Sequence, residues 1–210
     1  MKKHRIIVEK SARYFTLGNV SDNVQTVLFV CHGYAQLADE FLAPFEKLSN
    51  ENLLIVAPEG LHRFYTKGHA AVVASWMTKE ERDDDIRDYI LFLDKVYAEV
   101  MRGISPKAKV IVLGFSQGAA TVSRWAVMGK SNIDKLILWC GFFPPDLQPS
   151  AIPEKSSLTV VTASNDRFVT AEQERSQLEK LKELRPDFKH VRFEGEHVVD
   201  VEVLGKMLGL

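Results

Sequence analysis

Residues 109–125 read KVIVLGFSQGAATVSRW, and the character of the chain changes in the middle of this segment. A run of β-branched and other apolar residues ends at Gly114, and small residues compatible with a helix follow from Gly118 onward. The two glycines allow a sharp bend around Ser116, because side chains at their positions would collide with neighbouring backbone. The pattern predicts a strand, a tight turn that exposes the Ser116 hydroxyl, and a helix whose positive N-terminal end faces that hydroxyl.

The motif Gly-x-Ser-x-Gly is not sufficient by itself. At average glycine and serine usage it arises by chance in roughly one chain in fourteen of this length, and a glycine-rich turn with an incidental serine is the alternative interpretation. A serine is also a poor nucleophile at neutral pH unless a base, itself oriented by a carboxylate, lies beside it. A catalytic role for Ser116 therefore requires an acid and a histidine elsewhere in the chain.

Size and composition exclude several classes of protein. The 210 residues are enough for one α/β domain with a buried core, and a hydrophobic content of 46% is ordinary for a soluble protein. The net charge of −1 gives no indication of nucleic-acid binding or of a polybasic membrane patch. No apolar run approaches the ~20 residues of a membrane span. The basic N-terminus precedes only three apolar residues, 6–8, too few for a secretory signal, so we expect a cytoplasmic protein.

Short apolar runs alternate with helical patterns along the chain. This order predicts an α/β fold with a mostly parallel sheet covered by helices on both faces. The predicted strands are 26–30, 53–56, 109–113, 135–139, 158–162 and 190–193, preceded by a hairpin-like pair over 5–9 and 13–17. Neither a repeat nor a linker interrupts the pattern, so we interpret residues 1–210 as one domain.

Capping signals and apolar periodicity predict three of the helices. Residues 78–81 (TKEE) read as a capping box before an apolar face that runs over 86–100. Residues 170–173 (TAEQ) read as a second capping box, and a last helix is predicted over 201–208. The connection 59–77 is longer than the usual ~2–6 residues between a strand and a helix. We interpret it either as cover for the sheet edge or as a wall or lid over the site.

An acid and a histidine follow two of the later strands. Segment 158–162 leads into Asp166, and segment 190–193 leads into His197. The carboxyl ends of parallel strands meet at one edge of a sheet, which is where open α/β sheets place their sites. When a serine occupies such a turn, the acid and then the histidine follow later in the chain. We therefore predict that Ser116, Asp166 and His197 form a catalytic triad.

Other acids and histidines compete for these roles. Glu194 and Glu196 lie too close in sequence to His197 to match the expected topology, and Asp200 lies on the helix beyond it. Asp166 is therefore the favoured acid. The remaining histidines follow no strand after the acid, and we interpret them as surface or core groups: His4, His62, His69 and His190.

The loop Cys31-His32-Gly33-Tyr34, which follows the 26–30 strand, is predicted to supply half of an oxyanion hole. The predicted donors are two backbone N–H groups. One belongs to Tyr34 in this loop, and the other belongs to Gln117, the residue after Ser116. His32 is a candidate second base. We interpret it instead as a group that orients the loop through hydrogen bonds.

Together these residues resemble the phospholipase/carboxylesterase family of small α/β-hydrolases, which includes the acyl-protein thioesterases. The resemblance runs from about Thr26 to Leu208, and Gly-Phe-Ser-Gln-Gly is its most specific part. Its weaker elements are Cys31-His32-Gly33, Ala57-Pro58-Glu59, Trp76, Cys140-Gly141-Phe142-Phe143-Pro144, Asp166 and His197. It implies an α/β-hydrolase fold without a large cap domain, and hydrolysis of carboxylic esters or thioesters by the Ser116–Asp166–His197 triad.

Three residues depart from the family pattern: Ala35 replaces a second glycine after His-Gly, Cys140 replaces a common serine, and Ala163 replaces a glycine. The strand order that the resemblance implies also separates Cys31 from Cys140 by two strand spacings. That is about 9–10 Å, beyond the ~7 Å Cα limit for a disulfide. Both are predicted to be free thiols, and we interpret them as small packed hydrophobic residues rather than reactive nucleophiles. They also lack the sequence spacing of metal ligands.

The sequence thus predicts a carboxylesterase-like serine hydrolase that needs no metal and no cofactor. The residues predicted to line the acyl side, with core packing as the alternative, are Phe64, Trp76, Phe142 and Phe143. Acyl thioesterases, lysophospholipases, peptidases and acyltransferases use the same nucleophile, so these activities remain alternatives. A non-catalytic binding protein with the α/β-hydrolase fold is the alternative from another functional class. The expected partner is a small-molecule ester or thioester, and a homodimer is compatible with the sequence.

Overall fold

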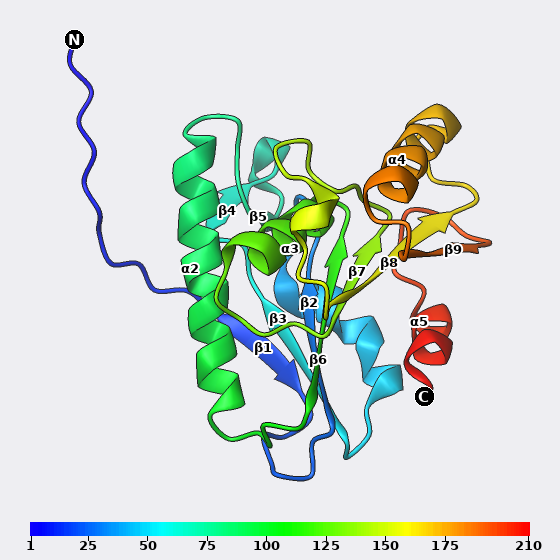
Figure 1. Ribbon diagram of the computed structural model, residues 1–210. Helices are drawn as coiled ribbons and strands as arrows, with labels where there is room; N and C mark the ends of the chain where they lie inside the picture. Colours follow the sequence, from blue (N-terminus) through cyan, green and yellow to red (C-terminus); the bar gives the residue numbers. More distant parts are fainter.

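The computed structural model describes residues 1–210 and contains a seven-stranded sheet with helices on both faces (Figure 1). The strands lie in the order β1-β3-β2-β6-β7-β8-β9, and every neighbouring pair is parallel except β1 with β3. Their bounds are β1 Tyr14–Leu17, β2 Thr26–Cys31, β3 Leu53–Pro58, β6 Lys109–Phe115, β7 Lys135–Trp139, β8 Ser157–Ala163 and β9 Lys189–Phe193. The mostly parallel α/β-hydrolase architecture is confirmed, and it has no large cap domain.

Alternating side chains of the central strands enter two separate hydrophobic clusters, one on each face of the sheet. In β2, Val27 and Phe29 point to the face covered by α2, α3 and α4, whereas Leu28 and Val30 point to the face covered by α1, η1 and α5. The helices are α1 Ala38–Leu42, α2 Arg82–Met101, α3 Gln117–Met128, α4 Ala171–Leu184 and α5 Val201–Leu208, with 3₁₀ turns η1 Ala43–Leu48, η2 Lys67–His69 and η3 Pro149–Ala151. Burial on both faces explains why these strands read as continuous apolar runs.

The six predicted sheet strands are confirmed to within two residues at each end, and the segment predicted over 13–17 forms β1, but the predicted N-terminal hairpin is wrong. Residues 5–9 form no strand, and the chain before β1 is exposed and extends away from the sheet (Figure 1). Ile6 and Ile7 are 86% and 87% exposed. An apolar triplet flanked by charged residues finds no partner here, and β1 pairs instead with the distant strand β3.

One predicted capping box is confirmed and the other is wrong. The Thr170 side chain accepts a hydrogen bond from the Gln173 N–H, and the Gln173 side chain caps Thr170 in return. At the start of α2 the cap residue is Glu81, in the left-handed conformation with φ 53° and without a side-chain cap. Asp85 instead accepts from the Thr78 N–H, which joins the first turn of α2 to the preceding loop.

The long connection 59–77 folds into a two-stranded antiparallel sheet of β4 His62–Tyr65 and β5 Val72–Ser75. A bridge between Gln36 and Ala74 joins it to the loop that follows β2. The connection therefore stands as a wall beside the carboxyl edge of the main sheet.

The structure also answers two questions about the cysteines and the helices. Strand β6 lies between β2 and β7, so Cys31 and Cys140 are kept apart, and both are buried free thiols as predicted. None of the helices combines the length and the apolar character needed to cross a bilayer.

Candidate active site

Ser116 occupies a strained turn between β6 and α3. Its backbone angles are φ 53° and ψ −114°, a conformation that residues with a side chain rarely adopt. The Ser116 N–H donates to the Trp139 carbonyl on the neighbouring strand β7 at 2.9 Å, which fixes the turn to the sheet. The residue itself is half-buried at the carboxyl edge. Strain at a turn of this kind is typical of an exposed nucleophile.

The glycines around this turn are required by close backbone contacts. A Cβ at Gly114 would lie 2.2 Å from the Gly118 oxygen, and a Cβ at Gly118 would lie 2.2 Å from the Cys31 oxygen. A Cβ at Gly141, after β7, would lie 2.5 Å from the Ser116 oxygen. The absence of a side chain at Gly118 lets the start of α3 lie directly against the end of β2, while Gly114 and Gly141 allow close backbone approach to Gly118 and Ser116.

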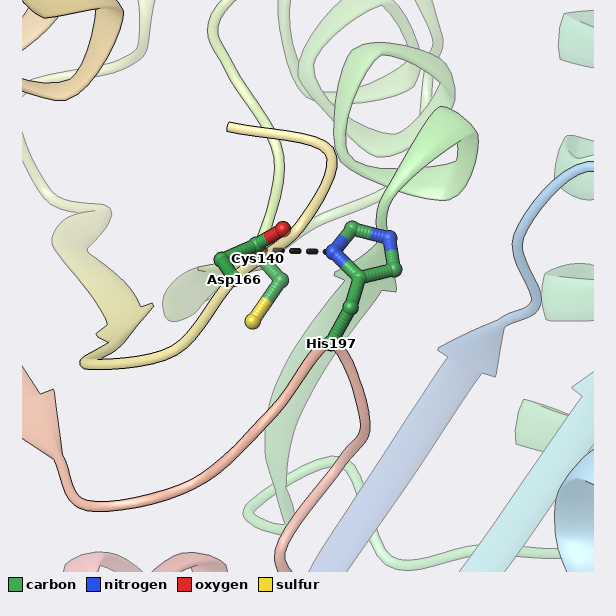
Figure 2. Close-up of side chains that lie close together, drawn as sticks. All are labelled: Cys140, Asp166 and His197. Carbon is green, nitrogen blue, oxygen red and sulfur yellow. Dashed lines mark hydrogen bonds and ion pairs between the residues drawn. The ribbon is translucent and has the colours of Figure 1, made fainter. Parts of the chain in front are cut away.

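Asp166 and His197 meet in space. The Nδ1 atom of His197 lies 2.7 Å from Oδ2 of Asp166, and the side chains are 11% and 5% exposed. The other ring nitrogen of His197 points away from Asp166 (Figure 2). Because an ionised carboxylate only accepts hydrogen bonds, this contact favours the tautomer with the proton on Nδ1 and a free lone pair on Nε2.

Backbone contacts hold the two loops together. The Ser164 N–H donates to the Phe193 carbonyl and the Asn165 N–H to the Gly195 carbonyl, each at 2.9 Å, so the β8–β9 ladder continues into the loops. On the other side, the Trp139 indole N–H donates to the Val198 carbonyl at 2.8 Å. The position of His197 is thus fixed by its neighbours in both directions.

The competing acids have other roles. Asp200 caps α5 by accepting from the Glu202 and Val203 N–H groups. Glu194 accepts from the Ser164 hydroxyl on the surface, and Glu196 is exposed. The four other histidines lie elsewhere: His4 and His69 are exposed, His62 pairs with Asp85, and His190 contacts Thr162 and Glu174.

Cys140 completes a cluster that the sequence did not reveal. Its sulfur, a carboxylate oxygen of Asp166 and a ring nitrogen of His197 all lie within 4.8 Å of one another (Figure 2). Burial and the neighbouring Asp166 carboxylate raise the pKa of the Cys140 thiol to about 12, so it is protonated at neutral pH. Sequence spacing could not find this group, because only the strand order β7-β8-β9 brings its three members together.

His32 holds the loop after β2. Its Nε2 accepts from the Gly60 N–H at 2.9 Å, and its Nδ1 lies 2.7 Å from the Gly33 carbonyl, so the proton belongs on Nδ1. Burial lowers the pKa of His32 to about 4, and the ring stacks against Trp76 at 5.0 Å. A neutral, fully hydrogen-bonded ring of this kind orients the loop and is unsuited to abstract a proton from substrate.

The two residues predicted to donate to the oxyanion belong to different elements: Tyr34 to the loop after β2 and Gln117 to the start of α3. The Gln117 side chain accepts from the Trp76 N–H at 3.2 Å and donates to the Met77 carbonyl at 3.2 Å, which ties the first residue of α3 to the wall beyond β5. The first N–H groups of a helix have no partner within the helix, and that of Gln117 is one of them. Tyr34 is 60% exposed, and the next residue, Ala35, has a left-handed φ of 59°.

The four aromatic residues predicted to line the acyl side separate into two groups. Trp76 is fully buried and donates to the His32 carbonyl, and Phe143 is a buried core residue; the structure thus favours the core alternative for these two. Phe64 and Phe142 are half-buried, and Phe64 packs on Tyr34 with ring centroids 5.6 Å apart.

Sequence analysis missed Phe168. Its ring centroid lies 4.7 Å from that of His197, although 62% of its surface is exposed. The Phe168 N–H donates to Oδ1 of Asp166 at 2.8 Å, so the residue belongs to the turn that holds the acid. Its place two residues after Asp166 is the only signal that the sequence carries.

The Ser116 hydroxyl makes no hydrogen bond to His197 in this structure, where Ser116 bonds through its backbone alone. Residues around Ser116 nevertheless contact the imidazole or lie next to the cluster that contains it. The preceding residue, Phe115, packs on the His197 ring at 4.9 Å, and Gly141 packs on the Ser116 backbone next to Cys140. Catalytic hydrogen bonds are commonly long before substrate binds.

Comparison with solved structures supports the same fold. The chain is similar to esterase PE8, with 19% identity and a TM-score of 0.72 over 95% of this chain and 99% of that one. It is similar to acyl-protein thioesterase 2 from Zea mays, with 13% identity and a TM-score of 0.71 over 95% and 97%. A phospholipase/carboxylesterase from Dyadobacter fermentans gives 16% identity and a TM-score of 0.66 over 97% and 99%. No curated protein sequence matches the chain significantly.

The family comparison covers most of the chain. The family described as "Serine aminopeptidase, S33" matches residues 22–187, from just before β2 to just past the end of α4. The match includes the strained turn at Ser116 and the loop that carries Asp166. The chain therefore belongs to the serine aminopeptidase S33 family of α/β-hydrolases.

Proposed function

We propose that the protein is a carboxylesterase-like serine hydrolase, with Ser116 as nucleophile, His197 as general base and then acid, and Asp166 as the group that orients the imidazole. The observation that carries this proposal is the 2.7 Å contact between Asp166 and His197 beside the strained turn at Ser116. The hydroxyl transfers its proton to Nε2 of His197 and attacks the ester carbonyl, and the imidazolium then protonates the leaving alcohol. Water hydrolyses the acyl-enzyme by the reverse sequence of proton transfers.

The oxyanion that forms in this reaction requires donors fixed in advance. In the proposal the backbone N–H groups of Tyr34 and Gln117 supply them, and one such donor is worth about 3 kcal/mol in the transition state. The network of His32 supports this role, because it holds the Tyr34 loop against the wall that also binds the Gln117 side chain. No step of this mechanism uses a metal or a cofactor.

The substrate is proposed to be a small ester with an apolar acyl or alcohol group. The support comes from two places: the exposed Phe168 ring packs on the imidazole, and the exposed Tyr34 ring packs on the half-buried Phe64 beside the predicted oxyanion loop. Exposed aromatic side chains beside a reactive group favour ligands with apolar groups.

A panel of p-nitrophenyl esters of increasing acyl length tests the proposal. Ser116→Ala should lower kcat by several orders of magnitude, because it removes the hydroxyl that attacks the ester carbonyl. Ser123→Ala is the matched control, since its hydroxyl lies in the same helix and only donates to the Ala119 carbonyl. Ester turnover that Ser116→Ala leaves largely intact would refute the role of Ser116.

Two further candidates stay within the same chemistry. The fold likeness to an acyl-protein thioesterase favours thioesters, and the family description favours peptides with a free N-terminus. An acyl-CoA, a lysophospholipid and an aminoacyl p-nitroanilide, run beside the ester panel, distinguish these candidates by their relative kcat/KM values. A folded protein that turns over none of them and fails to react with a fluorophosphonate would favour a non-catalytic binding protein.

A further inference from the structure

Cys140, Asp166 and His197 present three different ligand types to one point. One sulfur, one carboxylate oxygen and one ring nitrogen lie within 4.8 Å of one another, and Figure 2 shows the thiol and the carboxylate on the same side of the imidazole. We infer that these three side chains form a binding site for a soft divalent cation such as Zn²⁺ or Cd²⁺, and that its occupation inhibits the enzyme.

The spacing of the ligand atoms suits such an ion. Tetrahedral Zn²⁺, with bonds of about 2.0–2.3 Å, holds its ligand atoms roughly 3.3–3.7 Å apart. The Nδ1–Oδ2 pair, now at 2.7 Å, has to open by about 1 Å, and the pairs that include the sulfur have to close by at most about 1 Å. Side-chain movements of this size leave the backbone in place. Water is the expected fourth ligand, as in other zinc sites with three protein ligands.

The cluster is held in advance by its surroundings. The Cys140 N–H donates to the Val161 carbonyl at 2.9 Å, and Oδ1 of Asp166 accepts from two backbone N–H groups of its own turn. Only Oδ2 therefore turns toward the imidazole. Ligands fixed in this way lose little conformational freedom when an ion binds.

Charge also favours a divalent ion with a thiolate ligand. The thiol releases its proton to solvent when the metal–sulfur bond forms, so one thiolate and one carboxylate neutralise the two positive charges of the ion. A neutral cluster is much less costly to bury than an uncompensated charge. Thiolate ligation selects Zn²⁺ and Cd²⁺ over Mg²⁺ and Ca²⁺, which prefer oxygen ligands.

Inhibition follows from the tautomer of His197, and this part of the inference rests on the proposed function. Bound metal takes the lone pair of Nδ1, so the single proton of the neutral ring moves to Nε2. Nε2 then has no lone pair with which to accept the Ser116 proton. The ion also separates Asp166 from the imidazole that it orients.

Titration of the full chain with CdCl₂ tests the site directly. Binding should produce the ultraviolet charge-transfer band of a cadmium–thiolate bond in the wild type and in Ser116→Ala, which has no nucleophile but keeps all three ligands. Cys140→Ser should lose the band, whereas Cys31→Ser, which alters the other buried thiol, should retain it. MgCl₂ should produce no effect. Thermal melting of each variant verifies that it is folded, and Cys140→Ala replaces Cys140→Ser if the latter does not fold.

The inhibition is measured separately. The Cd²⁺ concentration that halves p-nitrophenyl ester turnover should rise at least about 10-fold in Cys140→Ser, because a direct thiolate ligand is lost; each protein is compared with its own metal-free rate. Chelation with EDTA should restore turnover in the wild type. A band that persists in Cys140→Ser, or that disappears in Cys31→Ser, would overturn the site. A Cys140-dependent band without any loss of turnover would overturn the inhibitory role alone. If even the metal-free enzyme lacks turnover, the proposed function fails, while the band in Ser116→Ala still decides the site.

Discussion

Asp166 contacts His197 with only one of its two carboxylate oxygens. Oδ2 lies 2.7 Å from Nδ1 of His197, while Oδ1 accepts from the Phe168 and Val169 N–H groups at 2.8 and 3.1 Å. One side chain therefore both fixes its own turn and orients the imidazole. The two tasks use different oxygens, so a substitution can separate them.

Asp166→Asn makes this separation. The amide oxygen can still accept the two N–H groups of the turn, but the amide nitrogen cannot accept a hydrogen bond from Nδ1 of His197. We expect kcat for p-nitrophenyl butyrate to fall about 10³- to 10⁴-fold, with little change in melting temperature. Glu194→Gln, on the exposed competing acid, is the control and should retain its rate. Comparable rates for Asp166→Asn and the wild type would contradict the assignment of the acid.

Phe168 offers a test of substrate preference. Its exposed ring lies against His197, so it can contact an apolar group of a bound ester. We expect Phe168→Ala to lower kcat/KM for octanoyl esters about tenfold while acetyl esters change less, since burying part of an aromatic ring is worth about 1–2 kcal/mol. Tyr65→Ala removes an equally exposed ring (63%) from β4 and serves as the control. An equal loss of kcat/KM for esters with short and long acyl chains would contradict this role and indicate that Phe168 positions the imidazole instead.

The buried His32 predicts how stability depends on pH. Its pKa is lowered by burial from 6.5 to about 4 in the folded protein, so the unfolded chain binds more protons between these values. The contribution of His32 to the free energy of unfolding is therefore fully present above pH 6.5, and it decreases as the pH falls toward 4. The expected loss is about 3 kcal/mol, which urea denaturation at several pH values measures.

His32→Gln supplies the comparison, because glutamine does not titrate and its oxygen can accept from the Gly60 N–H. All other histidines are common to both proteins, so the difference between the two pH profiles isolates residue 32. Parallel profiles would contradict the lowered pKa.

Replacement of Ala35 by glycine should stabilise the folded protein. Its φ of 59° lies in the left-handed region, where a Cβ costs roughly 1–2 kcal/mol relative to glycine. We expect Ala35→Gly to raise the free energy of unfolding by up to about 1 kcal/mol, because the added freedom of glycine in the unfolded chain offsets part of the gain. Ala70→Gly, at an exposed residue with an ordinary φ of −69°, should lower it slightly. A lower stability for Ala35→Gly than for the wild type would contradict this account.

The sequence predicted the sheet because both of its faces are covered. Runs such as 110–113 and 136–139 are apolar throughout, and polar or turn residues flank them. The same rule failed for residues 5–9, because an apolar triplet does not indicate whether a partner strand exists. The box at 78–81 failed because Glu81 adopts a left-handed conformation that moves the start of α2. Local patterns do not contain such tertiary information.

The candidate site was accessible to sequence analysis only in part. Ser116, Asp166 and His197 each follow a recognisable strand, and the strand order brings Asp166 and His197 together. Cys140 joins them through the same order, but its sequence neighbours carry no sign of this. The burial of Trp76 was equally hidden, since an aromatic residue in a long connection reads the same whether it faces the core or the substrate.

Intact-protein mass spectrometry after brief incubation with a fluorophosphonate tests the central claim most directly. The account predicts one covalent adduct per chain, located on Ser116 by peptide mapping, and no adduct on Ser116→Ala when Ser123→Ala is labelled like the wild type. An adduct on any other residue, or folded wild-type protein that remains unlabelled, would contradict it.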